Sequence, residues 1–275
     1  MNKKWLIFIS LLAMGFIISA CSSTEGQKLE EIYANATEAS ENLESLAMTI
    51  ESEQTFEVEG GDGSGETNSP FPTDVPIQST IESEMQMDPV AFHQTIETMG
   101  QSMEQYYTKE GFYMTSPMEE GWMKAPKELL DQMNAVSAQQ QTPASQLETL
   151  KDYVDEFDLE TEGSLYILSF SSEGENVQKL IEDSVKETMP EGMFSEDMMA
   201  GVEINELSYR FAIDKESYYP QNMNMDMNMT VEENGESITI QQSMYGEYSR
   251  FNEIEEITIP EEVIETAKEM PDIQG

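Results

Sequence analysis

Cysteine and histidine, on which many catalytic and metal sites depend, are almost missing from this chain. Among its 275 residues there is one cysteine, Cys21, and one histidine, His93. A single cysteine excludes an internal disulfide, and a single histidine excludes a metal site built on two imidazoles. We interpret His93 as a surface residue of a strand and not as a catalytic acid or base.

The sequence motifs of common enzyme classes are missing as well. There is no Gly-x-Ser-x-Gly elbow, no phosphate-binding P-loop and no Gly-x-Gly-x-x-Gly segment that opens a helix. Ser184 and Lys186 are close in sequence, but residues two apart on a helix do not face each other. A catalytic pair of carboxylates stays open among 55 acidic residues, although no pair stands out. We expect no enzyme activity, no cofactor and no bound metal.

Basic residues are scarce relative to acidic ones. The chain has 13 Lys and Arg against 55 Asp and Glu, which gives a formal net charge of −42. Such a charge repels polyanions, so we exclude nucleic acid as a partner. The carboxylates either bind cations or form a solvated acidic surface. Because they are spread along the chain and not clustered at ligand spacing, we favour the solvated surface.

The N-terminus, by contrast, has the clear pattern of a secretory signal. Lys3 and Lys4 precede an apolar run over residues 5–18, which is shorter than the ~20 residues of a spanning helix. The run ends in Ile18-Ser19-Ala20-Cys21, which resembles the bacterial lipobox. This resemblance implies cleavage before Cys21 and attachment of a diacylglyceryl group to its thiol. The alternative is an ordinary signal peptide followed by a chance cysteine.

These features predict three segments along the chain. They are a lipoprotein signal peptide at 1–20, a lipidated tether at 21–27 and a single domain at 28–275. Two acyl chains hold a protein stably at a membrane where one does not. We therefore expect the mature protein on the outer face of the cytoplasmic membrane, in a Gram-positive type of envelope, attached through diacylglyceryl-Cys21. Its protein partners and oligomeric state stay open.

Hydrophobic periodicity predicts both helices and strands. Apolar residues at steps of three and four indicate helices over 28–47, 142–157, 177–189 and 261–268. Alternation of apolar and polar residues indicates strands over 48–58, 75–87, 90–98 and 204–213, and from there almost to Pro260. A hairpin is predicted around Gly111, which we expect to supply a positive φ at the turn.

One-sided alternation is typical of an antiparallel sheet with one packed face and one wet face. The apolar stripes of the helices need a surface to cover, and the apolar face of that sheet is the only large candidate. We therefore predict an α+β fold in which a curved antiparallel sheet, a half-open barrel, wraps over helices.

The order of these segments resembles the LolA/LppX/LprG type of lipoprotein carrier, and most closely the uncharacterised Bacillus-type lipoproteins of that shape. The resemblance covers most of residues 28–268 and includes a strand that ends in Asp214-Lys215 before Pro220 begins the next one. It implies an apolar cavity for acyl chains between sheet and helices, and hence binding of a lipid-like ligand.

The most unusual local pattern is a row of four methionines on alternate positions, Met223, Met225, Met227 and Met229. Soft thioethers suit Cu(I), but four residues spaced by two extend over ~20 Å at ~3.4 Å per residue, too far for one ion. We interpret them as an adaptable apolar strand face in the core or in a ligand cavity. The candidate cavity-lining residues are Leu207, Tyr209, Phe211, Met223, Met225, Met227, Met229, Ile238 and Ile240.

Two functions are consistent with these observations. The first is a cell-surface lipoprotein that binds, or binds and transports, a lipid or another hydrophobic ligand. The second is a non-catalytic envelope or sensor-associated module that works through protein contacts and holds no ligand. A filled core without an apolar cavity would favour the second.

Overall fold

The computed structural model describes residues 21–59, 75–117, 119–127, 129–130, 147, 150–188, 201–233 and 236–270. In chain order the elements are α1 (Cys21–Glu41), β1 (Ser45–Glu59), β2 (Ile77–Met87), β3 (Val90–Thr98), β4 (Gln101–Thr108), β5 (Gly111–Ser116), β6 (Glu119–Lys124), η2 (Lys151–Glu156), β7 (Asp158–Glu162), β8 (Leu165–Glu173), α4 (Glu175–Thr188), β9 (Val202–Asp214), β10 (Pro220–Glu233), β11 (Glu236–Ser249), α5 (Glu261–Thr266) and β12 (Lys268–Glu269).

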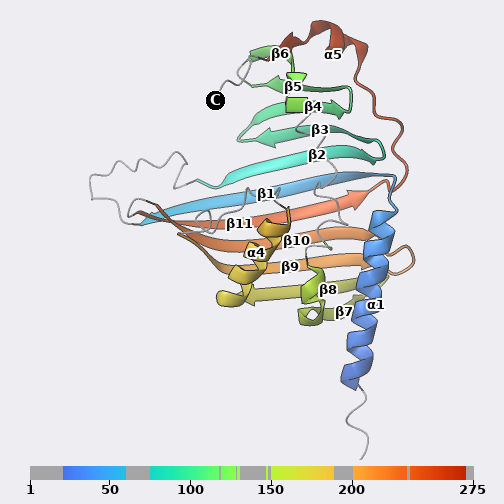
Figure 1. Ribbon diagram of the computed structural model, residues 1–275, viewed down its shortest axis with the longest axis vertical. Helices are drawn as coiled ribbons and strands as arrows, with labels where there is room; N and C mark the ends of the chain where they lie inside the picture. Colours follow the sequence, from blue (N-terminus) through green and yellow to red (C-terminus); the bar gives the residue numbers. More distant parts are fainter. Residues whose placement is uncertain are drawn as a thin grey trace, which may run out of the picture.

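The strands form one 12-stranded sheet in the order β12-β6-β5-β4-β3-β2-β1-β11-β10-β9-β8-β7 (Figure 1). Neighbouring strands are antiparallel except for the parallel pair β12 and β6. Strands β2–β6 form one run of sequence neighbours and β7–β11 form another. Strand β1 joins the two runs, because it pairs with β2 on one side and with β11 on the other.

The predicted α+β fold is wrong. The sheet is open, with β12 and β7 as its two edges, and it does not wrap over helices. Among the described residues the helices are short additions to this sheet: α4 packs on β8 and β9, and α1 packs on η2 (Figure 1). The long strands take up most of the described chain. Helices α1 and α4 therefore lie only over the half of the sheet formed by β7–β11 and do not make up a separate helical layer.

The first helix differs from its predicted bounds at both ends. It begins at Cys21, so the residues predicted as a tether are its first turns, and it ends at Glu41. Leu43 and Leu46 continue the helical spacing and are buried, but Leu46 already belongs to β1. The spacing was misleading there because Leu46 also fits the alternation of β1, where Met48 and Ile50 follow it on the same face.

Two predicted features lie outside the described residues. They are the signal peptide at 1–20 and the start of the helix predicted from 142. The later part of that helix is described, and residues 151–156 form the 3₁₀ helix η2. The predicted strands and the helix over 177–189 are otherwise present as β1–β3, β9–β11 and α4, and β7 was not predicted. The strand prediction that ran almost to Pro260 is wrong after Ser249, because residues 250–260 form no strand.

Aromatic contacts fasten α1 to the sheet. The phenol of Tyr33 on α1 donates a hydrogen bond to the carbonyl of Leu147, and its ring lies 6.2 Å from that of Phe157. Phe157 in turn lies 5.3 Å from Phe170 on β8. Because all three rings are buried, this chain of contacts places the helix by packing and not by backbone pairing.

Alternation along β1 separates the two faces of the sheet. Met48, Ile50 and Phe56 are buried on one face, whereas Glu51 and Glu57 are exposed on the other. The same separation of faces continues on the strands that pair with β1, because residues directly opposite each other on paired strands point to the same side of the sheet. We call the apolar side the inner face and the acidic side the outer face.

Gly111 has a different role from the predicted one. It begins β5 and is not among the residues with positive φ. A Cβ atom at this position would lie 2.5 Å from Cε2 of Tyr113 and 3.5 Å from Cδ1 of Ile259. Tyr113 is buried, so its ring has little room to move away. Glycine is needed here because the Tyr113 ring approaches the backbone closely.

We expect Gly111→Ala to lower the free energy of unfolding by about 1–3 kcal/mol, since the added methyl group would overlap the buried ring of Tyr113. Urea unfolding monitored by circular dichroism measures this. Gly26→Ala on α1 is the matched control, because nothing lies within 4 Å of the position that its methyl group would take, and alanine favours a helix by ~0.5–1 kcal/mol. An unchanged stability of Gly111→Ala would contradict the close approach.

Candidate functional site

The nine predicted cavity-lining residues lie together on the inner face of three adjacent strands. Three methionines of β10 face predicted residues of β9: Met223 faces Phe211, Met225 faces Tyr209 and Met227 faces Leu207. On the other side Met229 faces Ile240 of β11. The sequence therefore identified one continuous apolar surface.

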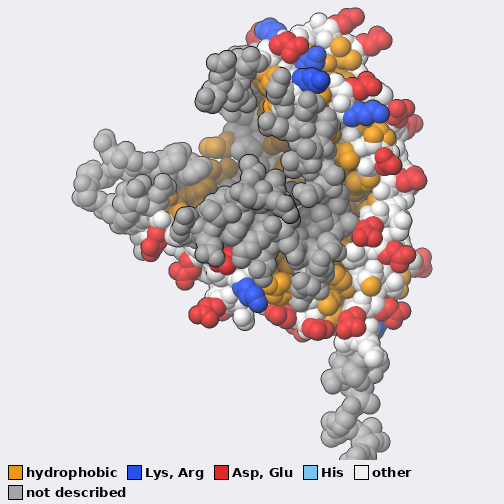
Figure 2. All heavy atoms as spheres, viewed as in Figure 1, with side chains coloured by type: hydrophobic (Ala, Val, Ile, Leu, Met, Phe, Trp, Pro, Cys, Tyr) orange, Lys and Arg blue, Asp and Glu red, His pale blue; other side chains and the backbone are white. Residues whose placement is uncertain are grey.

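This surface is only partly open. Leu207, Phe211 and Met223 are each at most 1% exposed, so they are packed in the core. Burial raises the pKa of Tyr209 beside them. Met227, Met229, Ile238 and Ile240 are half-buried toward the far ends of the strands. Figure 2 shows hydrophobic side chains on this side of the molecule and acidic side chains along its margins.

A cleft lies elsewhere, where the chain returns after β11. Residues 250–260, which we call the C-terminal strap, lead from β11 to α5 past the ends of β2–β5 (Figure 1). The cleft between the strap, α5 and these strands has a volume of about 670 Å³. Its lining residues are Gln86, Pro89, Val90, Ala91, Thr108, Lys109, Glu110, Tyr113, Glu256, Ile257, Thr258, Ile259 and Ile264.

The lining of this cleft is mainly apolar, with polar groups among it. Ala91 and Tyr113 are buried on the strands, Ile257 and Ile259 are half-buried on the strap, and Ile264 of α5 is 51% exposed. A large exposed isoleucine beside an apolar cleft marks a surface that gains free energy when a ligand covers it.

Side chains hold the strap against the sheet. Asn252 Oδ1 accepts hydrogen bonds from the backbone N–H groups of Glu44 at 2.8 Å and Ser45 at 3.3 Å. Farther along, Gln86 Oε1 accepts one from the N–H of Ile257 at 2.7 Å. The strap is therefore fastened at separate points and lacks the continuous ladder of a strand.

None of the nine predicted residues lines this cleft. The sequence did contain a signal for it. Ile257 and Ile259 alternate with Thr258 just before Pro260, and Val263 and Ile264 are adjacent apolar residues on a six-residue helix. Only one of that adjacent pair can face the sheet, and Val263 is the buried one, which leaves Ile264 to the cleft.

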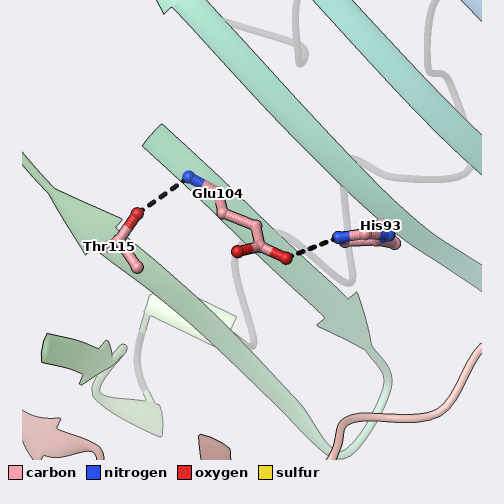
Figure 3. A network of polar contacts seen from close by, with 3 residues as sticks. All are labelled: His93, Glu104 and Thr115. Carbon is pink, nitrogen blue, oxygen red and sulfur yellow. Dashed lines mark hydrogen bonds and ion pairs between the residues drawn. The ribbon is translucent and has the colours of Figure 1, made fainter. Parts of the chain in front are cut away.

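His93 belongs to a polar and aromatic cluster on the outer face of β3–β6. Its Nε2 donates to Glu104 Oε1 at 2.8 Å, and the backbone N–H of Glu104 donates to Thr115 Oγ1 at 2.8 Å (Figure 3). The imidazole also stacks on Tyr106, with ring centroids 4.2 Å apart. The surface-strand interpretation of His93 fits these contacts, which bind three neighbouring strands together.

Two further absences apply to the described part of the chain. Within it, no group of three or more His, Cys, Asp or Glu side chains is arranged to hold a metal ion. None of its helices combines the length and the apolar character needed to cross a membrane.

The fold and cleft define a protein built on one open antiparallel sheet with a strap-bounded apolar cleft. Residues 28–268 match a family of unknown function, DUF6612, and the chain belongs to that family. No curated protein matches it.

Two solved structures are similar to this chain at low identity. A DUF1329 family protein from Desulfovibrio piger is 8% identical, with 80% of this chain and 92% of that chain covered and a TM-score of 0.23. A β-barrel-like protein of the domain of unknown function DUF1849 from Brucella abortus is also 8% identical, with 75% and 97% covered and a TM-score of 0.20. At these scores the two structures carry no functional inference.

The pKa of the Tyr106 phenol is raised by burial and, next, by the charge and hydrogen bond of Glu104. We expect Glu104→Gln to move this pKa down toward the ordinary value, because the neutral amide no longer opposes the phenolate. NMR titration of ¹³Cζ-labelled tyrosine, with the resonance assigned through Tyr106→Phe, measures the shift. Glu160→Gln on β7 serves as the control, and an equal shift in both variants would contradict the local cause.

Proposed function

We propose that the protein is a non-catalytic, lipid-anchored extracytoplasmic protein that binds a hydrophobic, lipid-like ligand in the strap-bounded cleft. The observation that carries this proposal is the cleft itself. Its volume of about 670 Å³ falls within the range of small-molecule sites, which are mostly apolar with a few polar groups that orient the ligand.

The cleft has the chemistry expected for an apolar chain with a polar end. Val90, Ile257 and Ile264 offer aliphatic contacts, while Gln86 and Lys109 supply polar groups beside them. Each methylene removed from water there contributes about 0.8 kcal/mol, so a short acyl chain would gain several kcal/mol. The strap is held by hydrogen bonds at only a few separate points, and this supports the proposal. A segment with few backbone hydrogen bonds opens at a low cost in free energy.

The proposed anchor would lie close to the folded body. Cys21 is the first residue of α1, and Leu29 of the same helix belongs to the hydrophobic core. Eight helical residues span ~12 Å. The lower part of α1 projects beyond the sheet (Figure 1). A diacylglyceryl group on Cys21 would therefore hold the domain near the membrane, which is the source of a lipid-like ligand.

For the anchor, we expect Cys21→Ser to release the protein from the membrane fraction into the medium and to abolish incorporation of radioactive palmitate. The reason is that serine offers no thiol for the diacylglyceryl group. Ser22→Ala is the matched control and should stay in the membrane fraction. Retention of Cys21→Ser in that fraction would contradict the proposed anchor.

For the cleft, we expect native mass spectrometry of the protein purified from its host to find a bound lipid. Ile264→Glu should weaken binding of a fluorescent fatty-acid analogue at least about tenfold, since it places a charge among apolar groups. Val75→Glu is the matched control, because Val75 is 58% exposed and lies outside the cleft. A ligand-free mass together with equal analogue binding by both variants would overturn the proposal.

A further inference from the structure

A groove crosses the outer face of the sheet on the side away from the apolar residues of β10. One hollow of about 450 Å³ lies over β2, β1, β11 and β10, and a second of about 600 Å³ lies over β10, β9, β8 and β7. The two hollows share Asn224 and Asp226 on β10. With strands ~4.8 Å apart, six strand spacings make the groove ~29 Å long.

The centre of the groove is built from two rows of directly opposed residues. In one row Glu51 of β1 faces Tyr245 of β11, and in the next row Glu53 faces Ser243. On the other side of β11, Ser243 faces Asp226. Tyr245 is 37% exposed and is one of the few large hydrophobic residues open to solvent in the described chain. The carboxylate of Glu51 therefore lies opposite an exposed aromatic ring, and those of Glu53 and Asp226 lie in the next row.

Two of the three carboxylates, those of Asp226 and Glu53, are held by neutral donors. Ser243 Oγ donates to Asp226 Oδ1 at 2.7 Å, and Gln78 Nε2 donates to Glu53 Oε2 at 2.8 Å. The arginine of the groove, Arg210, is paired with Glu162 at 3.1 Å. None of the ion pairs formed within the described residues includes Glu51, Glu53 or Asp226. Within the described residues, the charges of Glu53 and Asp226 are thus oriented by hydrogen bonds, and no ion pair compensates any of the three acids.

We propose that this groove binds an extended, Lys- or Arg-rich segment of another polypeptide. A cationic side chain placed over the Tyr245 ring gains a cation–π contact and lies beside Glu51. The groove length suits about nine extended residues at ~3.3 Å each. A second copy of this chain is a poor occupant, because it has 13 basic against 55 acidic residues and would be repelled.

The probe for this proposal is a fluorescently labelled ten-residue peptide of alternating lysine and threonine, which presents all its lysines on one side when extended. Anisotropy titrations use the full lipidated protein in a neutral detergent. We expect Glu51→Gln/Glu53→Gln/Asp226→Asn to weaken binding about tenfold and Tyr245→Ala to weaken it about threefold.

The decisive control removes three exposed acids from α5, as Glu261→Gln/Glu262→Gln/Glu265→Gln, and changes the net charge equally. It should weaken binding less than about twofold, because the groove acids are closer to the peptide than a screening length. Equal weakening by both triple variants would show non-specific attraction and overturn the proposal.

Two further readouts complete the test. Glu51→Lys, a single charge reversal, should abolish binding while the circular dichroism spectrum stays unchanged. Binding of a neutral oligosaccharide that depends on Tyr245, without binding of the peptide, would also overturn the proposal. Because the cleft residues are not altered in any of these variants, binding of the fatty-acid analogue should be unaffected in all of them.

Discussion

The pairing of β1 with β11 is the interaction on which the rest of the structure depends. All remaining strand pairs join strands that are adjacent in the sequence, apart from the short pairing of β12 with β6. From Ala47 opposite Ser249 to Glu59 opposite Ser237, one continuous register joins the two runs of strands. A shift by one residue would turn Met48 and Ile50 toward solvent and bring Glu51 into the core. Burial of the inner face therefore specifies this long-range register.

The same register creates two surfaces with opposite chemistry. The inner face carries the methionines of β10 and the aromatic residues of β8 and β9, and it is covered in part by α4 and η2. The outer face carries most of the exposed acids of the strands, so its charge and the apolar packing are separated by one layer of backbone. Where the strap crosses the ends of β3 and β5, it buries Ala91 and Tyr113 and forms the cleft. The cleft and the acidic groove are thus independent sites on one scaffold.

Periodicity predicted most strands because alternation is a local property. Strand β9 and helix α4 lie close to their predicted bounds, whereas the strands predicted almost to Pro260 end with β11 at Ser249. Helix α1 was placed too late because its first residues are polar and show no apolar stripe, and it was extended too far because Leu46 fits both periods. Strand β7 was missed because Asp158, Glu160 and Glu162 make it acidic, a composition that also protects a sheet edge from further pairing.

By itself, the sequence determined the lipobox-like start, the acidic charge, the paucity of histidine and cysteine, and the shared face of the nine residues from Leu207 to Ile240. These are properties of composition and of spacing along one strand. The open sheet, the cleft and the groove were decided only by tertiary structure. Each depends on residues far apart in the chain, such as Ala91 with Ile259 and Glu51 with Tyr245, whose proximity is set by the β1–β11 register and the course of the strap.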